Sequence, residues 1–195
     1  NGIVGLKQTY GRVSNYGSFP LAWTLDHIGP MTKNVKDAAA LLEVIAGFDA
    51  KDITSVNVPV DDYLGGITGD VKDLVIGINE EYFFDRVDSD IEQAVRDKIK
   101  KLEALGAKVK EVHIPSLKFS EWAVMTTIIS EPAAIHQQDH LHRPEDYGED
   151  LQFLFDLGEL PSAVDYVQAQ QIRRHLKQDF QNIFEEVDVL ITPTL

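Results

Sequence analysis

Three histidines and one aspartate near the middle of the chain carry groups that can bind a metal ion. They are His136, Asp139, His140 and His142. Two histidines four residues apart on a helix can share a zinc ion. The sequence has no H-E-x-x-H motif, however, and no further ligand nearby completes a tetrahedral site. We therefore interpret these histidines as solvated surface residues, and we predict no metal site and no cofactor.

A serine nucleophile with a histidine base is a second chemistry that the residue types allow. Asp26 and His27 are adjacent, but no serine stands at a spacing that defines a catalytic triad with them. The hydroxyl residues Thr9, Ser14 and Ser18 lie in the same stretch and could line a site. Hydroxyls in such loops more often bond the local backbone, so we expect that role instead. The chain has no cysteine, which excludes thiolate chemistry and disulfides.

The most informative charged residue is an arginine inside an apolar pattern. Along the predicted C-terminal helix, residues recur at alternating steps of three and four, as in a buried seam. The members of this seam are Tyr166, Ala169, Arg173, Leu176, Phe180, Ile183 and Val187. A buried guanidinium needs a carboxylate, a group of carbonyls or an anionic ligand. Arg173 should therefore meet one of these partners. The alternative is an arginine that reaches the surface from the seam edge or pairs inside the protein.

Two strands and a helix around the midpoint of the chain form the predicted framework. The apolar run 74–78 and the segment 108–114 are predicted strands, and residues 89–105 are the clearest helix. Ser89 and Glu92 are predicted to form a capping box at its start. Its apolar stripe contains Ile91, Val95, Ile99, Leu102 and Leu105. Strand, helix and strand with short joints predict a parallel βαβ unit. Residues 80–87 would then lie where open sheets place ligands.

The remaining elements follow from caps and glycines. We expect a helix over 34–46 capped by Asn34, a long loop over 48–69, and a helix over 120–141 bent by Pro132. Glu131, next to this proline, is interpreted as a member of a structural pair. A short helix is expected over 150–157, then a long helix from Pro161 to Val187 and a strand over 188–192. The predicted fold is α/β, with a mixed, largely parallel sheet and helices on both faces.

The overall charge argues against nucleic acid as a direct ligand. The 195 residues include 18 basic and 32 acidic side chains, a formal net charge of −14. Nucleic-acid binding needs a basic face that displaces counterions, and no basic run is longer than Lys98, Lys100 and Lys101. No apolar run approaches the roughly 20 residues that span a bilayer. We therefore predict neither direct nucleic-acid binding nor membrane insertion, and a cytoplasmic location.

The glycine-rich opening stretch carries a family resemblance. Residues 1–31 contain five glycines and two prolines, which indicates either an ordered functional loop or a set of surface turns. Within it, GIVGLKQTYGRVS, and after it LDHIGPMTKNVKDAAALLEVIAGFDAKD, resemble the amidase signature family. The resemblance continues at LVIGI, at LGAKVKEVHIP and at FEEVDVLITPTL, in the order found in that family. Two positions differ, since the family usually has Cys where Asn1 stands and Pro where Gln8 stands.

This resemblance implies an α/β/α sandwich of which residues 1–195 are the central and later part, truncated at both ends. It implies hydrolysis of carbon–nitrogen amide bonds by a Ser–cisSer–Lys triad. The missing serine would attack the amide carbonyl and the missing lysine would act as base, with backbone N–H groups holding the oxyanion. Both serines and the lysine would precede Asn1, so no catalytic residue is expected here. The fragment alone is expected to be inactive, and the substrate to be a small-molecule amide.

Two other functions remain open. One is the glutamyl-tRNA amidotransferase A subunit, which works with partner subunits. In that branch an arginine of the matching helix contacts the substrate carboxylate, which would give Arg173 this role. The region from Glu131 to Asp165 fits that branch poorly, so a general amidase is favoured. The other is a non-catalytic scaffold or binding protein that keeps the fold.

Overall fold

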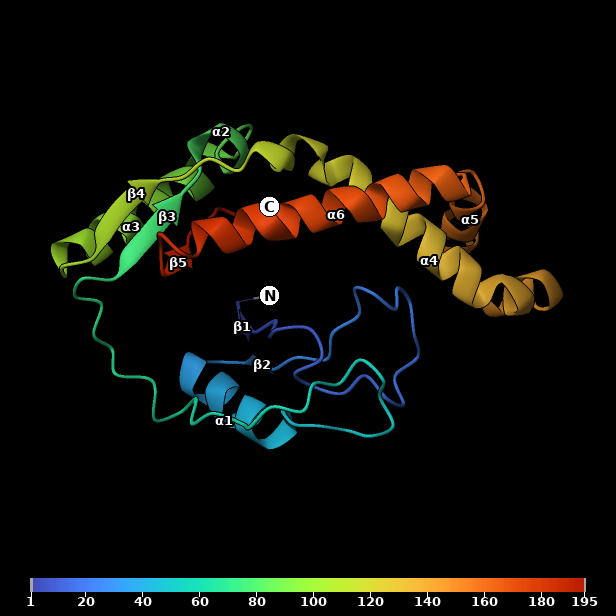
Figure 1. Ribbon diagram of the computed structural model, residues 1–195, viewed down its shortest axis with the longest axis horizontal. Helices are drawn as coiled ribbons and strands as arrows, with labels where there is room; N and C mark the ends of the chain where they lie inside the picture. The colour runs from blue at the N-terminus through green and yellow to red at the C-terminus, as the bar shows by residue number, and fades with distance from the viewer. Residues whose placement is uncertain (1, 195) are drawn as a thin grey trace. The chain divides into compact units, whose positions relative to one another are not determined.

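The computed structural model describes residues 2–194 and divides the chain into two compact units (Figure 1). One unit contains the residues up to Gly69 together with Glu131–Asp146. The other contains Asp70–Ser130 and the residues from Tyr147 onward. Each unit has its own secondary structure, and each holds different residues named above.

The second unit is built on a parallel three-stranded sheet. Strands β3 (Val75–Ile78), β4 (Lys108–Glu111) and β5 (Val189–Leu190) lie in the order β4-β3-β5. Ile76 pairs with Val109 on one side and with Val189 on the other. The apolar run of β3 suits a strand with a neighbour on each side, and Ile76 is fully buried. The predicted βαβ unit and the α/β fold are confirmed, and the antiparallel pairing lies in a separate ribbon in the other unit.

Helix α3 (Ser89–Ala104) connects β3 to β4 and begins where predicted, but its capping residue differs from the prediction. The capping residue is Asp88, whose side chain accepts a hydrogen bond from the N–H of Asp90. The predicted capping box of Ser89 and Glu92 is therefore wrong, because Ser89 already lies inside the helix. Glu92 instead binds Arg96 one turn later. At the other end, Leu105 caps the helix and is 66% exposed, so the predicted apolar stripe stops before it.

The C-terminal helix α6 (Ala163–Ile183) packs on the sheet and begins two residues later than expected. Ser162 caps it and forms a capping box with Asp165, so Pro161 precedes the helix instead of opening it. The helix ends at Ile183, yet Val187 remains buried beyond it. The core of this unit joins the end of α6 to the segment after β4, and its buried members are Val112, Ile114, Leu117, Ile183 and Val187. The part of the predicted seam from Leu176 onward therefore faces this core.

Short elements complete the second unit. They are α2 (Glu80–Phe83), the 3-10 helix η1 (Pro115–Phe119) and α5 (Glu149–Gly158). Asn79 caps α2 through the N–H of Tyr82 and also donates to the carbonyl of Val112. This bond ties the end of β3 to the residue that follows β4. It also marks where β4 ends at Glu111, three residues earlier than predicted.

The first unit consists mainly of loops held around one helix. Strands β1 (Val4–Gly5) and β2 (Met31–Thr32) form an antiparallel ribbon, and α1 (Val35–Ile45) follows. Asn34 caps α1 as predicted, with its side chain accepting from the N–H of Asp37. The segment 48–69 contains neither helix nor strand, also as predicted. Two segments far apart in sequence meet here, since the N–H of Val56 donates to the carbonyl of Gly11.

Helix α4 (Ser120–His142) has residues in both units, and the division falls between Ser130 and Glu131. The fully buried Pro132 lies one position after the division and inside the helix. Proline removes one backbone donor from the helical ladder at this point. The short 3-10 helix η2 (Pro144–Asp146) follows. Of the helices in residues 2–194, none is both long and apolar enough to cross a bilayer.

Candidate functional site

Arg173 lies at the middle of α6, in the seam where an apolar residue is expected. The buried Ala169 and the half-buried Leu176 flank it along that face. The Arg173 side chain is itself half-buried. Its Nη1 donates to Oε1 of Gln170, one helical turn earlier, over 2.7 Å. The Arg173 guanidinium therefore has one partner within its own helix.

Gln170 connects Arg173 to helix α4 within the same unit. Its Nε2 donates to Oγ1 of Thr127 over 3.1 Å. The Thr127 side chain is fully buried, and its hydroxyl donates to the carbonyl of Ala123 over 2.7 Å. Neither Thr127 nor Gln170 was predicted to take part in a site. The only local signal was the i, i+3 spacing of Gln170 and Arg173, which places the two side chains on one face.

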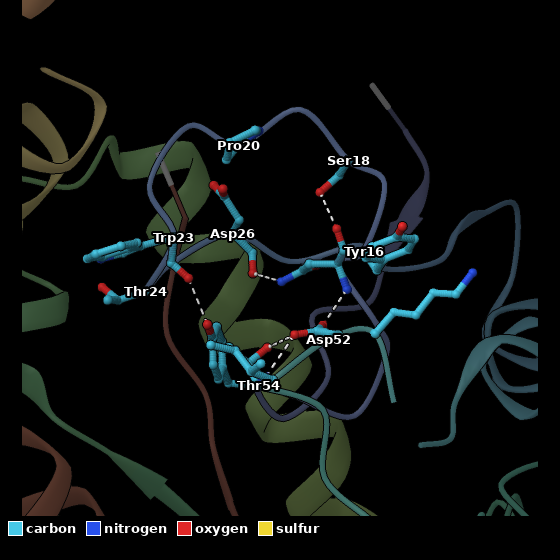
Figure 2. Close-up of a pocket in the computed structure, with 12 residues that line it drawn as sticks. Tyr16, Ser18, Pro20, Trp23, Thr24, Asp26, Asp52 and Thr54 are labelled. Atoms are coloured by element: carbon cyan, nitrogen blue, oxygen red, sulfur yellow. Dashed lines mark hydrogen bonds between the residues drawn. The ribbon is translucent and has the colours of Figure 1, made fainter. Parts of the chain in front are cut away.

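A hollow in the first unit, with a volume of about 480 Å³, is lined by Tyr10, Tyr16 and Trp23 of the opening loop. Figure 2 shows the rings of Trp23 and Tyr16 on opposite sides of the view, with Asp26 between them. Both rings are largely exposed, at 64% and 61%. The Lys51 ammonium lies 5.2 Å from the centroid of the Tyr16 ring. These groups can offer flat faces and one cation to a ligand.

The acidic residues of this hollow serve the backbone. Both oxygens of Asp26 accept main-chain hydrogen bonds, from the N–H groups of Leu21 and Ala22. His27 shares a hydrogen bond with the carbonyl of Leu25 through Nδ1, over 2.6 Å. Asp26 and His27 are thus engaged separately in local turns.

Asp52 organises the other wall of the hollow. Its carboxylate accepts from the hydroxyl and N–H of Thr54 and from the N–H of Asn15 (Figure 2). These hydrogen bonds, that of the Thr54 hydroxyl foremost, hold the pKa of Asp52 below its usual range. The carboxylate is consequently a fixed anion that joins the loop around Asn15 to the loop around Thr54. It is poorly suited to act as a general base near neutral pH.

The loop hydroxyls mostly serve local structure, as expected. Ser18 donates to the carbonyl of Asn15. Ser14 accepts from the N–H of Tyr16 and donates to Oδ2 of Asp49 over 2.8 Å. The N–H of Lys51 and this serine hydroxyl lower the pKa of the Asp49 carboxyl. Neither serine contacts a histidine or a lysine in these bonds, so the loop contains structural hydroxyls.

Arg12 is a second buried guanidinium, and it was not singled out from the sequence. It is 7% exposed and donates to the Tyr63 hydroxyl and to the carbonyls of Val58 and Pro59. It also forms an ion pair with the exposed Asp61, at 3.7 Å. These partners pin the segment 58–63 onto the opening loop. The side chain therefore has a structural role.

The histidines that were considered as metal ligands have different environments in the structure. His136 is 4% exposed, and its Nε2 shares a 2.8 Å hydrogen bond with the carbonyl of Pro20. The expectation of a solvated surface histidine is therefore wrong for His136, which packs against Phe19 and ties α4 to the opening loop. His142 is exposed and bonds its own helix at Gln138. Within the described part of the chain, no group of three or more metal-binding side chains is close enough to hold an ion.

The C-terminal ends of β3 and β4 border a smaller hollow of about 460 Å³. Its polar lining includes Glu81, Tyr82, His113 and Lys118. The Tyr82 hydroxyl is engaged with the Ser120 hydroxyl at 2.7 Å. The place is the one expected for ligands in an open parallel sheet. That expectation rests on fold analogy, and the hollow offers no further sign of a ligand site.

The sequence profile of the Amidase family matches residues 1–195. The chain belongs to the Amidase family. An amidase of Pseudomonas putida is 42% identical over 193 residues, covering 98% of this chain and 41% of that protein. The A subunit of the glutamyl-tRNA(Gln) amidotransferase of Listeria welshimeri is 39% identical over 217 residues, covering 99% of this chain and 45% of that protein. The corresponding protein of Thermotoga maritima has a crystal structure that superposes with a TM-score of 0.82 at 31% identity, covering 99% of this chain and 42% of that one.

These matches confirm the resemblance and the fold, and they show how much of its relatives the chain covers. The chain spans about two-fifths of the length of the curated relatives it matches. The alignment with the Pseudomonas amidase has 193 positions and covers 98% of this chain, so it contains few gaps. The alignment with the Listeria protein extends over 217 positions, more than the 195 residues of the chain, so it contains gaps. The chain therefore aligns with the general amidase with fewer gaps than with the amidotransferase subunit.

Proposed function

We propose that the chain is the scaffold and pocket wall of an amidase that hydrolyses carbon–nitrogen bonds of small-molecule amides. The match of the Amidase family over all 195 residues carries this proposal. The described serine hydrogen bonds involve carboxylates, carbonyls, amides and a tyrosine, and none joins a serine to lysine or histidine. The proposal assigns attack on the amide carbonyl to a Ser–cisSer–Lys triad outside these residues.

In this proposal Arg173 is the substrate contact, and residues 1–195 are the central and later part of one amidase domain that acts in the cytoplasm. A guanidinium on a partly buried helix face suits a carboxylate or a carbonyl of the substrate. The triad supplies the chemistry, and the fold holds the pocket in shape. The chain requires no cofactor for this reaction.

The amidotransferase A subunit is the second candidate, favoured by the 39% identity with the Listeria protein. In that case glutamine would be the amide, and partner subunits would be required. The nearly gapless alignment with the Pseudomonas amidase favours the first candidate. A scaffold protein that keeps the fold without the chemistry is the third.

A chimera tests these proposals. Residues 1–195 replace the aligned stretch of the Pseudomonas putida amidase, and the product is assayed with propionamide, acetanilide and glutamine. Turnover of the simple amides supports the amidase proposal, while ammonia release from glutamine alone supports the amidotransferase. The control is the same chimera with the nucleophilic serine of the Pseudomonas part changed to alanine.

The 195-residue chain by itself is the complementary sample. We expect it to hydrolyse none of the three amides, since the proposed triad lies outside it. Turnover that survives repeated purification of the isolated chain would contradict this assignment. A folded chimera that turns over no amide, next to an active parent amidase, would support the scaffold function instead.

A further inference from the structure

We propose that the hollow of the first unit lined by Tyr10, Tyr16 and Trp23 binds an organic ammonium ion. This inference concerns a ligand site and does not depend on the proposed amidase function. Three observations carry it: exposed aromatic faces, a surplus of negative charge in the lining, and a cation of the chain itself that already lies near one of the rings. All of these residues belong to the first unit.

The aromatic and apolar side chains of the hollow are unusually exposed. The rings of Tyr16 and Trp23 are largely exposed, and Ile53 in the same lining is fully exposed. A single exposed apolar side chain needs no explanation, but several that line one hollow form a surface that suits a ligand. The face of an aromatic ring carries negative partial charge and attracts cations, that of tryptophan most strongly. The volume of about 480 Å³ is sufficient for a small organic ion.

The charged side chains of the lining favour a cation over an anion. They are the two carboxylates of Asp26 and Asp52 and the single ammonium of Lys51, so negative charge is in excess by one. Backbone N–H groups hold both carboxylates in place, which fixes these charges in the walls. The whole chain carries a formal net charge of −14. An anionic ligand would therefore be repelled both locally and at a distance, whereas a cation would be attracted.

Lys51 shows how a cation is accommodated in this hollow. Its Nζ lies 5.2 Å from the centroid of the Tyr16 ring, a distance at which cation–π attraction acts. The lysine side chain is exposed and flexible, so a ligand cation can take its place at the ring while the lysine ammonium moves into water. Lys51 therefore competes with a cationic ligand. Its removal should strengthen the binding of a cation and weaken the binding of an anion.

Hydrogen bonds hold the two exposed rings in place before a ligand binds. The Tyr10 hydroxyl donates to the carbonyl of Trp23 over 2.7 Å. The N–H of Asn15, the residue before Tyr16, donates to the carboxylate of Asp52 over 2.7 Å. Because both ring-bearing segments are already ordered, binding loses little conformational entropy.

Three probes of similar shape separate the effect of charge from that of shape. Choline has a trimethylammonium head, 3,3-dimethylbutan-1-ol has carbon in place of its nitrogen, and 3,3-dimethylbutanoate is an anion with the same tert-butyl head. Each probe is added at constant ionic strength to the 15N-labelled 195-residue chain, and NMR follows the indole Nε1–H signals of Trp23 and Trp122. Trp122 belongs to the second unit and is the internal control.

Choline should shift the Trp23 signal with a dissociation constant of about 1 mM and leave the Trp122 signal unchanged. The alcohol and the butanoate should bind about tenfold more weakly or not at all, since neither offers a cation to the rings. Equal binding of choline and the alcohol would overturn the proposal, because it would show that shape alone is recognised. The absence of any saturable choline shift at Trp23 would overturn it as well.

Lys51→Met decides which sign of charge the hollow accepts. Choline should bind about three- to fivefold more tightly to this variant, because the competing ammonium is gone. Lys36→Met is the matched control, since it removes the same charge from an exposed lysine of the same unit and should leave choline binding close to native. Unchanged or weaker choline binding in Lys51→Met would overturn the proposal. Equal tightening in both variants would reduce the effect to net charge and would overturn the competition at the ring.

The contribution of the ring itself is tested with Tyr16→Leu. Choline should bind about fivefold more weakly to this variant, because one aromatic face is lost. Phe153→Leu removes a similarly exposed ring from the second unit and should change nothing. Both substituted side chains are exposed, so both variants should fold. Choline binding that Tyr16→Leu leaves at the native strength would refute recognition by the aromatic faces.

Discussion

Glu131 of helix α4 holds Thr24 of the opening loop through two hydrogen bonds. Its Oε2 accepts from the Thr24 N–H at 3.1 Å, and its Oε1 accepts from the Thr24 hydroxyl at 2.6 Å. The two residues are 107 positions apart in sequence, and Glu131 is only 4% exposed. The structural pair expected for Glu131 is thereby confirmed, and its partner is the loop that borders the aromatic hollow.

Substitution of Glu131 should destabilise this loop, and the loss of stability should be larger when the new side chain can accept fewer hydrogen bonds. Glu131→Ala leaves the Thr24 donors unpaired and should lower the free energy of unfolding by about 2–3 kcal/mol. Glu131→Gln can keep one acceptor and should lose about 1 kcal/mol. Urea unfolding followed by Trp23 fluorescence, in a Trp122→Phe background, reads out this unit. The exposed Glu145 is the control, and Glu145→Gln should change nothing measurable.

Arg12 should be equally sensitive, since three neutral acceptors surround its buried guanidinium. Arg12→Met removes the bonds to Tyr63, Val58 and Pro59 and should destabilise the first unit by about 2–3 kcal/mol. Faster amide hydrogen exchange should appear over residues 56–67. Arg86 is 91% exposed and pairs only with its neighbour Asp85 in the described ion pairs, so Arg86→Lys is the matched control. Equal loss of stability in both variants would contradict the structural role of Arg12.

Substitution of glycine by alanine should have a large effect at one position of the first unit and almost none at another. A Cβ at Gly29 would collide with the carbonyl oxygen of Leu6 and lie 3.0 Å from Oε1 of Gln8. Gly29→Ala should therefore cost about 2–3 kcal/mol, because backbone cannot move aside cheaply. At Gly5, on β1, no heavy atom lies within 4 Å of such a Cβ, and Gly5→Ala should change stability by less than about 0.5 kcal/mol. Thermal unfolding of the two variants side by side checks the contrast.

The ion pair of Glu80 and Arg96 should make part of the stability pH-dependent. Their two hydrogen bonds, of 2.8 and 2.7 Å, lower the pKa of Glu80 from its ordinary value of 4.5. A lowered pKa in the folded state stabilises the protein above the unfolded-state value, and this stabilisation is lost as the pH falls through the folded-state value. Glu80→Gln should thus lose about 0.5 kcal/mol at pH 7, a small loss because both side chains are about one-third exposed.

Urea unfolding at a series of pH values measures this dependence. The difference between the native chain and Glu80→Gln should be constant above about pH 5 and shrink as the pH drops below 4.5. Glu81, the exposed neighbour on α2, provides the control, because Glu81→Gln should show no such trend. A difference that stays constant down to about pH 3 would refute the assignment of the shift to this ion pair.

Local pattern in the sequence was enough to predict most of the framework. Apolar spacing placed α1, α3 and α6, and the run from strand to helix to strand predicted the parallel pairing of β3 with β4. Helix starts were less certain, since Asp88 and Ser89 can both cap a helix and only the backbone conformation selects one. The unusual position of Arg173 was also visible in the sequence, because a charged residue occupies an apolar position of the helical repeat.

The sequence by itself therefore determined the fold class, the family and the existence of an unusual arginine. Only the tertiary structure decided what the buried polar groups bind. Thr24 and Glu131, Arg12 and Tyr63, and Thr127 and Gln170 are partners separated by 43 to 107 residues. Periodicity reports which face of one element is apolar, but a hydrogen bond between distant segments depends on how the whole chain folds back. Such bonds fix the opening loop and the Arg173 side chain, and they become visible only in three dimensions.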